Sequence, residues 1–228
     1  MTELGQRYQA IVEAIATAAT SASRDPKEIT LVVVSKNHPH QLVLDLLQLG
    51  VRDFGENRDQ EANPKAKQVA LETSLEFNWH FIGQLQTNKV KSVLEYATYL
   101  HSIDRTSLLD ELIKRTAEKE VPLKVFIQVN MTDDPERGGV KPLELMAFAE
   151  RVLSSPGLEL VGLMGVGGLD VAPELEFERL AQLSGQLQQL CSGADKLSMG
   201  MSGDFETAIA YGATHLRIGT AITGIRPS

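Results

Sequence analysis

Cysteine is almost missing from this sequence of 228 residues, in which Cys191 stands alone. A single thiol excludes an internal disulfide and any metal site built from several cysteines, and it suits a reducing compartment. Long apolar runs are missing too, since no stretch approaches the ~18 consecutive apolar residues of a membrane span. The first residues carry Glu3, Arg7 and Glu13 and lack the apolar centre of a signal peptide. We therefore expect a cytoplasmic protein with no membrane partner.

Positive charge is also scarce. The 22 Lys and Arg residues are outnumbered by 30 Asp and Glu, which gives a formal net charge of -8. Such a balance argues against general nucleic-acid binding, which needs a basic surface to displace counterions. The 43% hydrophobic and 23% charged residues are typical of a soluble globular protein. No Gly/Ser-rich linker or shift of composition divides the chain, so we expect one domain over residues 1–228.

Short β-branched runs alternate with helical patterns along the chain. The first run, Ile29–Ser35, is nearly all apolar, as in a strand buried on both faces. The next segment has helical spacing and stops at Gly50. The same reasoning predicts strands at Ile29–Ser35, Val51–Gly55, Trp79–Gly83, Tyr99–Ile103, Leu123–Val129, Leu158–Val166, Leu197–Met201 and His215–Gly219. It predicts helices within Thr2–Ala22 and at Gln41–Leu49, Asp59–Leu75, Lys89–Tyr96, Thr106–Lys119, Pro142–Leu153, Pro173–Leu190 and Asp204–Tyr211.

Strict alternation of strands and helices predicts a parallel sheet covered by helices. Eight such units in 228 residues favour a single (β/α)₈ TIM barrel over the alternative, an open doubly wound sheet. Only nine residues follow the last strand, too few for a full covering helix. We expect the extra N-terminal helix to fill that gap.

Lys36 is the most specific candidate residue at the strand ends, where the active site of a barrel lies. It follows an apolar strand directly, so we expect it at the rim of a low-dielectric interior. Burial there would lower the pKa of the amine and make it nucleophilic enough to form a Schiff base. The alternative is a lysine that extends into solvent at the end of a strand.

Two further strand ends carry groups that suit a phosphate. Ser202–Asp204 opens a predicted helix, and Gly219–Thr220 forms a second small turn. These turns follow strands seven and eight, where barrels of this kind hold phosphates. Each has a plain alternative, a helix cap or a glycine turn. Together with Lys36 they indicate an aldehyde-phosphate ligand, pyridoxal 5'-phosphate first.

Other polar residues near strand ends are less specific. Arg217 suits a place beside a pyridine nitrogen, because arginine only donates hydrogen bonds, but it could equally bridge loops. His80 is interpreted as a structural histidine, and Asn57 follows a glycine-bearing turn where Asn is common. His38 and His40 stand close together without completing a metal-ligand pattern.

Several motifs then occur in the order of a known family: Ser35-Lys36, Phe54–Asn57, Trp79–Lys89, His101–Asp104, Gly162–Met164, Leu197–Ser202 and Arg217–Ile222. Over about Val32 to Gly224 the chain resembles the pyridoxal phosphate homeostasis proteins. The Trp79–Gly83 and Ser198–Ser202 blocks are highly specific. The resemblance implies a barrel like the N-terminal domain of alanine racemase.

The resemblance also implies a cofactor and its contacts. It implies pyridoxal phosphate held as an aldimine on Lys36, with Asn57 beside it and Arg217 by the ring nitrogen. Phosphate contacts come from three residues and from the backbone of a neighbouring segment. These are Ser202, Gly219 and Thr220, with backbone help around Ser198 to Met201. The family is regarded as a non-catalytic carrier in vitamin B6 homeostasis, so we expect no catalytic residue, a monomer, and apo-enzymes as the partners that accept the cofactor.

Two alternatives remain from the sequence. An amino acid racemase needs a second base, a tyrosine from an additional domain in alanine racemases, and the four tyrosines here are not predicted at strand ends: Tyr8, Tyr96, Tyr99 and Tyr211. A regulatory module that binds another protein would use the cofactor as a signal.

Overall fold

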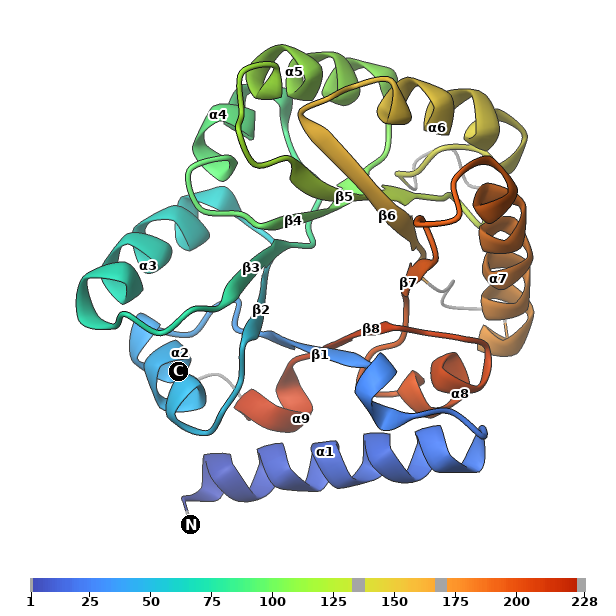
Figure 1. Ribbon diagram of the computed structural model, residues 1–228. Coiled ribbons are helices and arrows are strands. Elements are labelled where there is room, and N and C mark those ends of the chain that lie inside the picture. Colours follow the sequence, from blue (N-terminus) through green and yellow to red (C-terminus); the bar gives the residue numbers. More distant parts are fainter. Residues whose placement is uncertain (1, 133–137, 167–171, 225–228) are drawn as a thin grey trace.

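Eight parallel strands close into a barrel in sequence order, β1 to β8, in the computed structural model, which describes residues 2–132, 138–166 and 172–224 (Figure 1). The strands are β1 Thr30–Val34, β2 Asp53–Glu56, β3 Asn78–Phe81, β4 Tyr99–Ile103, β5 Leu123–Gln128, β6 Leu158–Met164, β7 Lys196–Ser198 and β8 His215–Ile218. The α-helices are α1 Glu3–Ser21, α2 His40–Gln48, α3 Asp59–Glu72, α4 Val90–Val93, α5 Thr106–Thr116, α6 Leu145–Leu153, α7 Pro173–Leu190, α8 Phe205–Ala210 and α9 Thr220–Thr223. The expectation of a single (β/α)₈ barrel is confirmed.

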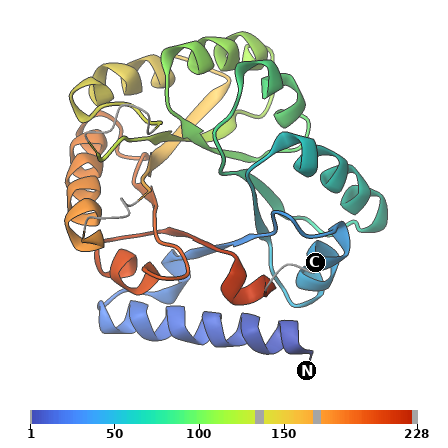
Figure 2. The ribbon, with the colours of Figure 1, turned by 180° about the vertical axis from the view of Figure 1, so that it is seen from behind.

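Strand β1 is mostly apolar because both of its faces are covered. Val32 and Val33, neighbours in β1 whose side chains face opposite sides of the sheet, are both completely buried. Pairing of β1 with β8 closes the barrel, with Thr30 opposite His215 and Val33 opposite Ile218. The ring of helices outside the barrel is visible from both sides (Figures 1 and 2).

Helix α1 covers the seam where the first and last strands meet. It packs against α8 and the short α9 (Figure 1). Arg7 Nε donates to the carbonyl of Ile222 at 2.7 Å, and just beyond the helix Arg24 Nη1 donates to that of Ala213 at 2.7 Å. The extra N-terminal helix therefore takes the place of a full helix after β8, as expected.

Some boundaries differ from the expected ones, for local reasons. β7 ends at Ser198 rather than Met201, because Gly200 has a φ of 90° and turns the chain. β2 begins at Asp53 rather than Val51, because the N–H of Val51 is still bonded to Leu46 at the end of α2. The helix expected at 89–96 is reduced to the four residues of α4 after a 3₁₀ turn, Thr87–Lys89.

None of the helices in the described ranges combines the length and apolarity needed to cross a membrane. The same ranges contain no group of three or more His, Cys, Asp or Glu side chains arranged to hold a metal ion.

Candidate functional site

The eight residues expected to bind a cofactor lie at the carboxyl ends of four neighbouring strands. Barrel closure places β7, β8, β1 and β2 side by side in that order. The residues are Lys36, Asn57, Ser198, Met201, Ser202, Arg217, Gly219 and Thr220, and we call this set the strand-end arc. Val34 pairs with Gly55, so the segments leading to Lys36 and Asn57 run together. The N–H of Arg217 donates to the carbonyl of Gly200 at 3.0 Å, which joins β8 to the loop after β7.

Lys36 lies on the turn that follows β1, with an exposed side chain. The burial that the sequence suggested for its amine is therefore not observed, because the turn carries the side chain beyond the apolar strand. The turn itself is held from α3: the N–H of Asn37 donates to Oε1 of Glu61. Asn37 has a φ of 64°, a left-handed conformation that Asn tolerates better than most residues. This contact fixes the backbone on one side of Lys36.

A buried ion cluster fixes the other side of Lys36. The ammonium of Lys65 donates to the carbonyl of Ser35 at 2.9 Å and to Oε1 of Glu56 at 2.7 Å. The hydroxyl of Ser35 donates to the same Glu56 oxygen at 2.7 Å. Burial raises the pKa of Glu56, and the charge and hydrogen bonds of Lys65 and Ser35 offset only part of that rise. Sequence analysis did not single out Lys65 or Glu61, since helical lysines and glutamates are common on surfaces.

Arg217 is buried inside the barrel near the ends of β7 and β8. Its Nη1 donates to the hydroxyl of Ser198 at 2.8 Å, and its Nη2 donates to the carbonyl of Gly165 at 3.0 Å. Burial lowers the pKa of Arg217 to about 10, so the guanidinium stays charged at neutral pH. No carboxylate of the described residues pairs with it, so the structure does not show the loop-bridging ion pair considered as its alternative.

Backbone N–H groups with no protein acceptor gather at the turns after β7 and β8. Within the described ranges, the backbone N–H groups of Ser202, Gly203, Gly219 and Thr220 donate to no protein acceptor. The Ser202 and Thr220 side chains are exposed. A Cβ at Gly219 would lie 3.3 Å from the Cβ of Val34, so glycine permits this close approach of β8 to β1. N–H groups and hydroxyls in such turns suit an oxyanion.

The segment before α8 differs in detail from a simple capped helix. Asp204 makes no side-chain cap; its Oδ1 accepts from the N–H of Met201 at 2.6 Å. Met201 is itself exposed. This bond holds the turn that carries Ser202.

A chain of polar side chains, buried except for the partly exposed Asp53, leads to Arg217 through the barrel, and sequence analysis missed it. Asp53 Oδ1 lies 2.9 Å from His80 Nε2, and His80 Nδ1 lies 2.9 Å from His101 Nε2. His101 Nδ1 lies 2.7 Å from Ser198 Oγ, which accepts from Arg217. We call these five residues the histidine chain. The signal available in the sequence was a histidine inside each of two apolar strands, which was interpreted only for His80, as structural.

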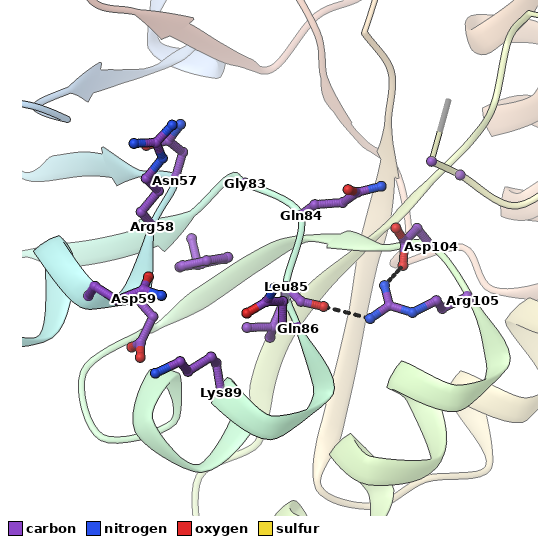
Figure 3. Close-up of a pocket in the computed structure, with 14 residues that line it drawn as sticks. Asn57, Arg58, Asp59, Gly83, Gln84, Leu85, Gln86, Lys89, Asp104 and Arg105 are labelled. Carbon is purple, nitrogen blue, oxygen red and sulfur yellow. Dashed lines mark hydrogen bonds and ion pairs between the residues drawn. The ribbon is translucent and has the colours of Figure 1, made fainter. Parts of the chain in front are cut away.

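A polar pocket of about 770 Å³ adjoins the arc, above the ends of β2, β3 and β4 (Figure 3). Of the arc residues, Asn57 is the one that lines it. Arg105 is held there by Asp104 at 2.5 Å and by the carbonyl of Leu85 at 2.8 Å. The pocket therefore adjoins the arc only on the side of Asn57.

Comparisons with known proteins agree on one family. Residues 7–227 match the family model described as alanine racemase, N-terminal domain. The pyridoxal phosphate homeostasis protein of Pseudomonas aeruginosa is 38% identical over 226 residues, covering 99% of this chain and 97% of that protein. The structure of PipY from Synechococcus elongatus with PLP bound is 32% identical, with a TM-score of 0.80, and covers 92% of this chain and 100% of that one. Alanine racemase from Corynebacterium glutamicum, 14% identical with a TM-score of 0.70 over 96% of this chain and 61% of its own, shares the fold.

Proposed function

Because this chain belongs to the pyridoxal phosphate homeostasis proteins, which are built on the alanine racemase N-terminal domain, we propose that it binds pyridoxal 5'-phosphate on the strand-end arc and supplies it within the cell. The observation that carries the proposal is the arc itself. An exposed lysine amine, a buried arginine and two donor-rich turns lie on four adjacent strands.

The donor set fits the chemistry of this cofactor. When bound, pyridoxal phosphate supplies an aldehyde for condensation with a primary amine, a basic ring nitrogen, and a phosphate dianion. Lys36 supplies the amine on the turn after β1. Ser202, Gly219 and Thr220 supply hydroxyl and backbone donors on the turns after β7 and β8, with no protein acceptor competing for the N–H groups in the described ranges.

Lys36 is the proposed attachment point, and the nearby Lys65 is not. The Lys65 amine is buried and surrounded by the carbonyl of Ser35 and the carboxylates of Glu56 and Glu61. An ammonium held in this way has neither access to an aldehyde nor a free electron pair. Lys36 is exposed and its neighbours in the chain are clamped, so its amine is presented at a defined place.

Arg217 has the role of donating to the ring nitrogen in this proposal. A guanidinium donates only, so it favours an unprotonated ring nitrogen. An unprotonated ring withdraws electrons from an attached carbon less strongly, which disfavours carbanion chemistry.

The positions of the tyrosines support a carrier over a racemase. Tyr8 lies on α1, Tyr96 follows α4, Tyr99 is the first residue of β4, and Tyr211 caps α8. All four lie in described parts of the chain, and none is at the carboxyl end of a strand. A two-base racemase therefore lacks its usual second base on this chain.

The proposal includes a cytoplasmic location and a monomeric state. A cytoplasmic location suits the single free thiol, Cys191. We take the working unit to be a monomer that passes the cofactor to apo-enzymes. Light scattering with and without an acceptor apo-enzyme tests this, and a stable dimer would contradict it.

An absorbance spectrum of the purified protein tests the central claim. We expect a band near visible wavelengths after incubation with pyridoxal phosphate, retained through gel filtration. After borohydride reduction, mass spectrometry should find the adduct on Lys36. A reduced adduct on another lysine, or no retained band, would contradict the proposal.

A further inference from the structure

The histidine chain crosses the whole barrel interior. It starts at Asp53, the first residue of β2, and passes through His80 of β3 and His101 of β4. It then crosses from β4 to Ser198 at the end of β7 and reaches Arg217 in β8. The Asp53 side chain is 21% exposed and that of His80 is 0% exposed, so the chain contacts solvent at its carboxylate end.

The direction of every hydrogen bond in this chain follows from its two ends. Arg217 can only donate, so the oxygen of Ser198 accepts from it. An ionised carboxylate can only accept, so Nε2 of His80 carries a proton and donates to Asp53. A neutral His80 then accepts at Nδ1 from Nε2 of His101. The remaining nitrogen of His101, Nδ1, accepts the hydroxyl proton of Ser198.

The opposite direction would require a charge where the barrel disfavours one. If His101 donated to Ser198, either His80 or His101 would have to donate from both ring nitrogens and become an imidazolium. Burial lowers the pKa of His80 and lowers that of His101 well below its ordinary value. Partial burial acts to raise the pKa of Asp53, but contacts with His80 and Asn78 outweigh it, and the net pKa is lowered. Both histidines are therefore neutral and the carboxylate is charged.

Aromatic rings pack against the two histidines of the histidine chain. His80 stacks on Tyr99 with ring centroids 4.3 Å apart, and the ring of His101 lies 4.4 Å from that of Phe126. His215 belongs to the same aromatic group, 6.1 Å from His101, but its hydrogen bond goes to Thr214 instead. Packing of this kind restricts the imidazoles to the hydrogen bonds described.

We propose that Asp53, His80, His101 and Ser198 are positioning residues that act through one another to fix the guanidinium of Arg217, with every hydrogen bond donated toward Asp53. The tautomer of each histidine and the rotation of the Ser198 hydroxyl are thereby set. Arg217 is anchored at Ser198 and Gly165 through two of its N–H groups. Its other N–H groups remain for a ligand, and the effect on pyridoxal phosphate rests on the proposed function.

Nitrogen NMR of the cofactor-free, ¹⁵N-labelled protein tests the direction of the hydrogen bonds in the histidine chain. At neutral pH we expect both His80 and His101 to carry a proton on Nε2 and none on Nδ1. A proton on Nδ1 of either histidine, in the neutral or the doubly protonated form, would overturn the proposal. This measurement does not depend on cofactor binding, so it separates failure of the chain from failure of the proposed function.

Cofactor titration of matched variants tests the positioning. His101→Leu breaks the histidine chain, and His215→Leu removes another buried histidine that lies outside it. We expect His101→Leu to shift the absorbance maximum of the bound cofactor and weaken binding about tenfold, with His215→Leu within about twofold of the native protein. Equal effects of the two would overturn the proposal. If His101→Leu does not fold, Ser198→Ala is measured against His215→Leu by the same criteria.

Discussion

The ammonium of Lys65 lies 2.9 Å from the carbonyl oxygen of Ser35, the residue that precedes Lys36. One lysine, buried on α3, thus holds the backbone that presents another, exposed lysine at the mouth of the barrel. The two amines have the same chemistry and opposite surroundings. Their different roles in the proposal follow from those surroundings.

Substitution of Lys65 by Met should destabilise the protein strongly. It leaves the carboxylate of Glu56 buried without its cation, and breaking a buried ion pair costs about 3–5 kcal/mol. Urea unfolding should show this loss, together with weaker cofactor binding because the Lys36 turn loosens. Lys67→Met is the matched control: Lys67 is on the same helix in an exposed pair with Glu95, and its loss should cost less than about 1 kcal/mol. Equal losses of unfolding free energy for the two variants would contradict the proposed role of Lys65 in holding Glu56 and the Lys36 turn.

Lys36→Ala should abolish the borohydride-reducible linkage to pyridoxal phosphate while the fold is kept, because an exposed side chain contributes little to the core. Mass spectrometry after reduction measures the linkage, and circular dichroism checks the fold. Lys27→Ala, another exposed lysine, should retain the linkage. A full-strength adduct on the Lys36→Ala protein would show that a different amine is the attachment point.

Ser202→Ala should weaken cofactor binding roughly tenfold. In the proposed arrangement the lost hydrogen bond goes to a charged phosphate, and such bonds exceed the ~1 kcal/mol of neutral ones. A loss of ~1.4 kcal/mol corresponds to a factor of ten. Fluorescence or absorbance titration gives the dissociation constant. Ser192→Ala serves as the control, because Ser192 is also exposed but precedes β7 in the sequence. Unchanged affinity of Ser202→Ala would place the phosphate elsewhere.

Stability should fall as the pH drops from about 6.5, through the buried histidines. Burial lowers the pKa of His215 to about 3, while an unfolded histidine titrates near 6.5. Between these values the unfolded chain binds a proton that the folded chain does not, so unfolding is favoured as pH falls. His215→Leu should reduce the slope by about 1.4 kcal/mol per pH unit between pH 6 and 4. Urea unfolding across that range measures the slope, and an unchanged slope would contradict a neutral buried His215.

The loaded protein should not racemise or transaminate amino acids efficiently. Such chemistry needs a stabilised carbanion and a placed acid or base on the reacting face, and the tyrosines lie elsewhere. The measurement is Cα deuterium exchange and D-isomer formation with each common L-amino acid, with a bacterial alanine racemase as the positive control. Turnover near ~1–10³ s⁻¹ would overturn the carrier assignment.

The order of strands and helices was predictable because short β-branched or aromatic segments alternate with helical patterns and turn residues separate them. The exact ends of the strands and helices were less predictable, since they depend on single local features such as the positive φ of Gly200. The eight arc residues could be proposed from strand ends and family motifs. Their side-by-side placement also needed closure of the barrel between β8 and β1.

The histidine chain was not predictable in the same way. His101 and Ser198 are separated by 97 positions and meet across the barrel interior, so no local pattern joins them. Lys65 likewise contacts Ser35 from 30 positions away. Interactions of this kind depend on register and tilt, which a single sequence does not express.

Because the barrel closes between β8 and β1, the strand-end arc combines residues from the N-terminal and C-terminal halves of the chain. Residues 117–122, between α5 and β5, form an exposed connection. A cut there would leave Lys36 and Asn57 on one half-barrel, and Ser202, Arg217 and Thr220 on the other. Neither fragment alone would hold both the amine and the phosphate end of the proposed ligand. Reassembly of the two fragments through the β4–β5 and β8–β1 strand pairs would bring both parts of the proposed site together again.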